Sequence, residues 1–112
     1  MIKTSTIDGV TIASFEGINR IVATNSEEIK KELNHLLDIS GSKFIVNMEH
    51  INYIDSTGFG TFISLLRTAT HKKATLKLCN LYPDVKKLFV VLHLDSVFEL
   101  FDNLDVCVQS FN

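Results

Sequence analysis

The sequence predicts an α/β fold in a single domain, 1–112, built as a small mixed β-sheet covered by about four helices. Three observations predict it. Short apolar runs typical of strands alternate along the chain with stretches that are apolar at every third or fourth residue. Asp8-Gly9 separates two strand patterns, residues 2–7 and 10–15, as in a two-residue hairpin. No linker or repeat divides the chain, so the sheet should combine an N-terminal antiparallel hairpin with parallel strands joined by helices.

A connection over residues 16–25 leads from the hairpin to the first predicted helix. The sequence offers two overlapping capping boxes for the start of this helix, Thr24 with Glu27 and Asn25 with Glu28. The apolar face follows at helical spacing, with Ile29, Leu33, Leu36 and Leu37. Gly41 is in place to end the helix, because glycine is favoured just after a helical C-terminus.

The middle of the chain predicts a buried strand and a second helix. Residues 43–48 are an apolar run rich in strand-forming side chains, and residues 49–54 form a loop. The helix then begins at Ser56 or Thr57 and extends to about Thr70. Its apolar face consists of Phe59, Phe62, Ile63 and Leu66.

The last third repeats this order. Residues 74–79 predict a strand, and Pro83 suits the first position of a helix. That helix has an apolar face made of Val85, Leu88, Phe89 and Leu92. Residues 97–100 predict a last short strand. For residues 102–112 we favour a short helix, and an extended segment through residues 106–108 is the alternative.

Composition excludes several classes of protein. The net charge of −2 provides no basic surface for nucleic acid. No apolar run approaches the roughly 20 residues of a membrane span, and the first residues lack the apolar stretch of a secretion signal. Cys79 and Cys107 stand at no metal-binding spacing. We therefore expect a cytoplasmic protein in which both cysteines are reduced, buried thiols without a disulfide.

Asp55, Ser56 and Thr57 stand where the strand pattern gives way to the central helix. The first N–H groups of a helix are free and carry partial positive charge, so a hydroxyl there is suited to carry or contact a phosphate. The residues alone leave Ser56 open as a plain helix cap or a phosphorylated residue. Asp55 either caps the helix, or orients the Ser56 hydroxyl or contacts a partner. Thr57 is either an inward-facing helix starter or a second phosphate acceptor.

The run Asp55-Ser56-Thr57-Gly58-Phe59-Gly60 resembles the signature D-S-[ST]-G-L-G of the STAS domain family, with Phe59 in place of the usual Leu. Residues 76–89 and 94–100 resemble the strand–turn–helix and closing segment of that family, so the resemblance covers nearly the whole chain. The small stand-alone members are bacterial anti-sigma factor antagonists. The resemblance implies a STAS-like domain without enzymatic activity or cofactor. It also implies that Ser56 is the residue phosphorylated by the partner.

The partner implied by this resemblance is an anti-sigma factor that is itself a serine kinase. The unphosphorylated protein would bind this anti-sigma factor serine kinase and so regulate transcription indirectly. Phosphorylation of Ser56, with ATP as the ligand of the kinase, would end the binding, and a phosphoserine phosphatase would restore it. The expected partner-binding residues are Asp55, Ser56, Thr57, Gly58, Phe59, Gly60 and Arg20.

Arg20 marks a departure from the family pattern. Family members usually carry Gly-x-[LI]-Asp in this region, and the position of that Asp falls here on Arg20 or Val22. Arg20 is either a contact for an acidic group of the partner or a solvated surface residue. Gly58 and Gly60 permit either close helix–sheet packing or close approach of a partner backbone. Phe59 is either part of the core or an anchor for the partner.

A different class of function fits the same fold. A STAS module can serve as an unphosphorylated scaffold or ligand sensor in a larger assembly, such as an envelope lipid-transport complex, with Ser56 as a plain cap. Enzyme chemistry finds less support. No G-x-S-x-G elbow surrounds Ser56, and Gly58-Phe59-Gly60 lacks the third glycine of a dinucleotide fingerprint. No two of the four histidines stand at metal-ligand spacing: His35, His50, His71 and His93.

Overall fold

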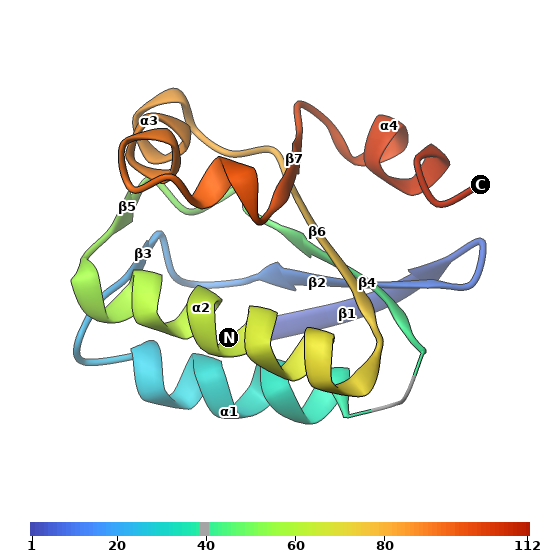
Figure 1. Ribbon diagram of the computed structural model, residues 1–112. Helices are drawn as coiled ribbons and strands as arrows, with labels where there is room; N and C mark the ends of the chain where they lie inside the picture. The colour runs from blue at the N-terminus through green and yellow to red at the C-terminus, as the bar shows by residue number, and fades with distance from the viewer. Residues whose placement is uncertain (39–40) are drawn as a thin grey trace.

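The computed structural model describes residues 1–38 and 41–112 of the chain. Strands and helices alternate along it, and Figure 1 shows their arrangement. The elements are β1 (Ile2–Ile7), β2 (Val10–Phe15), β3 (Arg20–Ile21), α1 (Ser26–Leu37), β4 (Lys43–Asn47), β5 (Tyr53–Ile54), α2 (Ser56–Lys72), β6 (Thr75–Cys79), α3 (Pro83–Val91), a 3-10 turn (Leu94–Ser96), β7 (Glu99–Phe101) and α4 (Leu104–Gln109).

The main sheet has five strands in the order β1-β2-β4-β6-β7. β1 and β2 are antiparallel, and the pairs β2–β4, β4–β6 and β6–β7 are parallel. The hairpin turns at Asp8 and Gly9, whose φ angles of 52° and 78° are those that a tight two-residue turn requires. The predicted α/β fold, with an antiparallel hairpin joined to parallel strands, is therefore confirmed.

The two faces of the sheet are covered unequally. α1, α2 and α3 enclose the larger apolar core on one face, and α4 closes a smaller core on the other. In Figure 1, α1 and α2 lie side by side on one side of the sheet, with α4 on the opposite side. Both cysteines belong to the smaller core as free, fully buried thiols, as the sequence predicts.

Lys77 is an unusual member of the smaller face, because only 7% of it is exposed. Its ammonium group donates to the carbonyl oxygen of Ser110 at 3.2 Å and to the Ser110 hydroxyl at 2.8 Å. It also pairs with Glu99 at 3.0 Å and lies over the rings of Phe111 and Phe101. A lysine of β6 thus anchors the C-terminal end of α4 to the sheet.

A second, two-stranded sheet joins β3 to β5 in parallel. The sequence patterns predict a connection over residues 16–25 and a loop over residues 49–54. This prediction is wrong for the residues that form β3 and β5. Ile21 and Ile54 are paired and buried at 0% and 2% exposure. Arg20 and Tyr53 are the other pair and are exposed. The small sheet leads directly into α2 and so positions its first turn.

The ends of α1 differ from the prediction. Asn25 is the N-terminal flanking residue, but neither expected capping box forms around it. Its side-chain oxygen instead accepts the N–H of Val22 at 2.9 Å, and its amide donates to the Arg20 carbonyl at 2.9 Å. α1 ends at Leu37, with Asp38 as its C-terminal flanking residue, so Gly41 does not cap it. The predicted continuation through residues 39–40 lies outside the described residues.

The last third of the chain needs two smaller corrections. β7 occupies residues 99–101 rather than 97–100, because a 3-10 turn carries the chain past Ser96 first. The favoured short helix near the C-terminus is confirmed as α4, so the extended alternative at residues 106–108 is wrong. No helix in the described ranges 1–38 and 41–112 is long and apolar enough to cross a membrane.

Candidate functional site

Asp55 organises the start of α2 through its side chain and its backbone. The carboxylate accepts the N–H of Gly58 at 3.0 Å and the hydroxyl of Thr57, which is the geometry of a helix cap. Its second oxygen accepts the N–H of Ala23 at 3.1 Å, from the segment after β3. The Asp55 N–H donates to the Ile21 carbonyl at 3.1 Å. One residue therefore fixes α2 to the small sheet.

The same hydrogen bonds hold Asp55 in its charged form. The Thr57 hydroxyl, followed by the Gly58 N–H, lowers the pKa of the Asp55 carboxyl below its ordinary value. The carboxylate is thus engaged with Thr57, Gly58 and Ala23. Of the two interpretations of Asp55, these contacts are those of the structural cap.

Ser56 is the first residue of α2, and its side chain is exposed. Within residues 1–38 and 41–112, its hydroxyl forms no hydrogen bond with another side chain or with a backbone carbonyl group. Ser56 shares an outward stripe of α2 with Gly60 and Ile63, which are also exposed. Its hydroxyl is therefore free to react or to contact another molecule.

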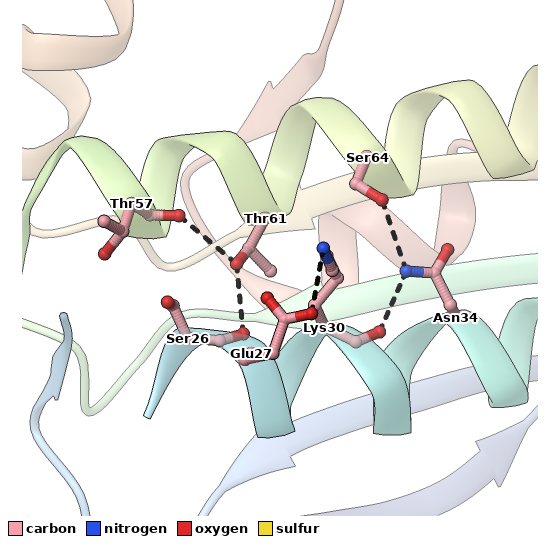
Figure 2. Close-up of polar contacts among 7 residues, drawn as sticks. All are labelled: Ser26, Glu27, Lys30, Asn34, Thr57, Thr61 and Ser64. Atoms are coloured by element: carbon pink, nitrogen blue, oxygen red, sulfur yellow. Dashed lines mark hydrogen bonds and ion pairs between the residues drawn. The ribbon is translucent and has the colours of Figure 1, made fainter. Parts of the chain in front are cut away.

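The neighbouring stripe of α2 faces α1 instead. Figure 2 shows Thr61 and Ser64 directed toward α1, and Thr57 lies one turn before Thr61. The buried Thr61 hydroxyl donates to the Ser26 carbonyl at 3.2 Å. The Asn34 amide donates to the Ser64 hydroxyl at 3.4 Å. Thr57 is exposed, yet its hydroxyl is already bound to Asp55.

The two glycines of the signature have different surroundings. A methyl group on Gly58 would lie 2.6 Å from the Ile21 carbonyl oxygen and 2.5 Å from a methyl carbon of Ile54. Gly58 thus lets α2 approach the small sheet closely. A methyl group on Gly60 would meet nothing within 4 Å. Gly60 leaves an open spot on the exposed stripe beside Ser56.

Phe59 lies mainly inside the molecule, at 7% exposure. Its ring packs edge-on against Phe89 of α3, with 5.2 Å between ring centroids. Phe89 makes similar contacts with Phe62 and Phe98. Phe59 therefore joins α2 to α3 beneath the exposed stripe and offers little of its own surface to a partner.

Arg20 is exposed on β3, beside the start of α2. Its guanidinium lies over the ring of Tyr53, at 5.7 Å from the ring centroid. Tyr53 is half exposed and belongs to the same surface, but the sequence patterns did not single it out. Strand alternation was the available signal, since an inward Ile54 requires an outward Tyr53.

Potential metal ligands and a surface depression are the other features to compare with the position of Ser56. Across the described part of the chain, no three His, Cys, Asp or Glu side chains gather as metal ligands. A surface depression of about 620 Å³ lies over residues of β2 and the loops near His50 and Tyr82. No residue of α2 lines it, so it is separate from Ser56. The surface around Ser56, Gly60 and Ile63 is exposed.

Comparison with known proteins identifies the class. A family model of the STAS domain matches residues 1–107, so the chain belongs to the STAS domain family. The "Putative anti-sigma factor antagonist BtrV" of Bordetella bronchiseptica is 24% identical over 105 residues, covering 94% of this chain and 89% of BtrV.

Solved structures share the fold over nearly the full length. An anti-sigma-factor antagonist (STAS) domain protein from Planctomyces limnophilus has a TM-score of 0.90 at 17% identity, covering 97% of this chain and 96% of that one. The Bacillus cell fate determinant SpoIIAA in its phosphorylated form has a TM-score of 0.72 at 16% identity, covering 100% of both chains. At these identities the structural likeness establishes the fold alone.

Proposed function

We propose that this protein is a bacterial, cytoplasmic anti-sigma factor antagonist controlled by phosphorylation of Ser56. Unphosphorylated, it binds an anti-sigma factor that is also a serine kinase, and a sigma factor is thereby released. The kinase uses its own ATP to phosphorylate Ser56, which ends the binding, and a phosphoserine phosphatase restores it. The observation that carries the proposal is the exposed Ser56 hydroxyl at the first position of α2, which has no hydrogen-bond partner among the residues that the structure describes.

The contacts around α2 favour Ser56 over Thr57 as the phosphate acceptor. The Thr57 hydroxyl donates to Asp55 and helps to cap the helix, so its modification would disturb the first turn. Ser56 takes no part in that network. Its phosphate would lie on the outward stripe with Gly60, whereas the Asp55 carboxylate is held by Ala23 and Gly58. The domain can therefore accept the phosphate without rearranging.

The switch we propose is electrostatic. A phosphate adds about −1.5 to −2 charge at pH 7, and the partial positive charge of the helix N-terminus tolerates it. In a protein–protein interface the same dianion loses water and meets the acidic groups of the partner. A penalty of about 3 kcal/mol raises Kd more than a hundredfold. That change is sufficient to separate the bound and released states.

Intact-mass measurement tests this proposal. The purified chain is incubated with ATP and the anti-sigma serine kinase encoded beside its gene. We expect a mass increase of one phosphate, lost in Ser56→Ala and retained in Thr57→Ala. Calorimetry should show that Ser56→Ala still binds the kinase and that Ser56→Asp binds far more weakly. A wild-type chain that neither gains mass nor binds any cognate kinase would favour the scaffold function and exclude the switch.

A further inference from the structure

α3 exposes more apolar surface than the fold requires. Residues 88–92 are five consecutive apolar side chains, and Phe89 is the buried one among them. A surface helix normally confines its apolar residues to the stripe that faces the core, and exposed apolar runs mark interaction sites. The exposed fractions are 40% for Leu88, 46% for Val90, 62% for Val91 and 49% for Leu92.

These exposed residues occupy two sides of α3. Val90 and Lys86, four residues apart, line a depression beside β7 together with Phe101. Residues four apart share one side of a helix, and those two positions away point in nearly the opposite direction. Leu88 and Leu92 therefore lie on the side of α3 away from β7, and Val91, three residues after Leu88, borders that side. α2 precedes β6 in the chain and packs on it, α3 joins β6 to β7, and Phe59 of α2 contacts Phe89 of α3. α2 therefore lies on the side of α3 away from β7.

The matching side of α2 bears the proposed phosphorylation site. Phe59 contacts Phe89, so the side of α2 that carries Phe59 faces α3. Ser56 and Ile63 stand three residues before and four residues after Phe59, and so belong to that side. Ile63 is itself an exposed apolar residue, at 38%. The exposed surface beginning at Ser56 thus continues over Ile63 toward the apolar side of α3.

We propose that Leu88, Val91 and Leu92, termed the α3 patch, are the apolar anchor for the partner that contacts Ser56. The inference rests on the proposed function and names a second part of its interface. The occupant is the kinase-type anti-sigma factor, whose surface must present apolar side chains beside the site that delivers phosphate. Continuity with Ser56 selects this occupant over a second copy of the chain, because a self-contact there would cover the hydroxyl that the kinase must reach.

The α3 patch and Ser56 have different roles in the proposed interface. Apolar side chains in the centre of an interface supply most of its affinity, and charge at their edge controls it. Phosphorylation leaves the α3 patch unchanged and adds a dianion at its border. The partner can therefore bind the unphosphorylated chain tightly and still release it after one modification.

Adjacent valines on α3 provide a matched test. Val91→Asp and Leu92→Asp place a charge in the α3 patch, and Val90→Asp places the same charge on the side of the helix next to β7. The purified kinase encoded beside the gene is titrated with each variant by calorimetry, with ADP present. We expect Kd to rise at least about tenfold for Val91→Asp and Leu92→Asp and to stay within about twofold for Val90→Asp. At low kinase concentration, phosphorylation of Ser56 should be slower in Val91→Asp and Leu92→Asp and nearly unchanged in Val90→Asp.

Circular dichroism verifies the fold of each variant. If an aspartate variant does not fold, Val91→Ser takes its place, and we expect a smaller rise in Kd for it. Unchanged binding by the α3 patch variants, with wild type bound and phosphorylated, would overturn this inference and leave the proposed function intact. The inference would also be overturned if Val90→Asp weakened kinase binding as much as Val91→Asp does. A wild-type dimer that Val91→Asp dissociates would overturn it as well, because the α3 patch would then bind a second copy of the chain. Absence of both binding and phosphorylation in wild type would overturn the proposed function and this inference with it.

Discussion

Gly58 and Gly60 stand two residues apart in α2 but face opposite surroundings. Gly58 lies against a backbone carbonyl that cannot move aside easily, while Gly60 faces open space. We predict that Gly58→Ala lowers the free energy of unfolding by about 1–3 kcal/mol through overpacking. Gly60→Ala should leave it unchanged or raise it by up to about 1 kcal/mol, because alanine favours the helix. Urea unfolding of both variants measures the difference, and equal stability of Gly58→Ala and wild type would contradict it.

The charge of Asp55 links stability to pH. Its folded-state pKa is lowered chiefly by the Thr57 hydroxyl and then by the Gly58 N–H, so the charged form is favoured in the folded protein. The resulting stability is complete above the unfolded-state pKa, near 4, and disappears as pH falls through the lowered folded-state pKa. We predict that the stability advantage of wild type over Asp55→Asn shrinks between about pH 5 and pH 2.

Chemical unfolding at a series of pH values measures this advantage. Asp38 needs a parallel Asp38→Asn control, because its pKa is also lowered, by hydrogen bonding to Lys72. The two effects should add, since separate partners cause them. A difference between wild type and Asp55→Asn that stays constant from neutral to acid pH would show that the Asp55 charge does not contribute.

At the scale of the elements, Lys77 holds the C-terminal end of α4 against the sheet. Lys77 donates two hydrogen bonds to Ser110 and lies over Phe111 at 4.2 Å from the ring centroid. We predict that Lys77→Ala lowers the free energy of unfolding by about 1.5–3 kcal/mol, because hydrogen bonds from a charged donor are lost. Hydrogen exchange should quicken in residues 104–109 and remain slow in α2.

Glu99→Gln provides the control for the ion pair. Glu99 is 62% exposed, so its pairing with Lys77 is screened by solvent and contributes at most about 1 kcal/mol. Glu99→Gln should therefore leave exchange in α4 nearly unchanged. Equal loosening in Glu99→Gln and Lys77→Ala would assign the anchoring to the ion pair instead of Ser110 and the aromatic rings.

The longer elements follow from periodicity, and the short ones do not. Phe59, Phe62 and Leu66 repeat over enough turns to predict α2 from sequence. β3 and β5 have two residues each, too few for any alternation to be recognised. Their pairing joins Ile21 to Ile54 across a long stretch of chain. The capping boxes predicted for α1 were wrong for a different reason, because the Asn25 side chain accepts the N–H of Val22 instead of one from the helix.

The position of the signature residues at a helix start could be predicted from sequence, but their individual contacts could not. The signature located Asp55 through Gly60 at the start of a helix. Sequence spacing cannot distinguish Gly58, enclosed by Ile21 and Ile54, from the open Gly60. The Asp55–Ala23 hydrogen bond likewise depends on the tertiary fold. Which side chains face α1, α3 or solvent became clear only from packing.

At the scale of the whole molecule, we predict that phosphorylation changes surface charge without changing the fold. The formal net charge of −2 becomes about −4 when a phosphate of roughly −2 is added. Because Ser56 lies outside the Asp55 network, NMR shift changes should be confined to residues near 20–25 and 53–63. The α4 side of the sheet should show none. Shift changes spreading to Lys77 or Cys107 would indicate a rearrangement and exclude the purely electrostatic switch.

The polar contacts between α1 and α2 determine the direction in which the Ser56 side chain points from α2. Asn34 bonds to Ser64 and Thr68, and Thr61 bonds to the first turn of α1, as Figure 2 shows in part. These contacts fix the rotation of α2 about its own axis. A shift of one residue along the helix would change the direction of every side chain by about 100°. A serine introduced at position 60 would point in nearly the same direction as Ser56, whereas a serine at position 58 would point into the small sheet.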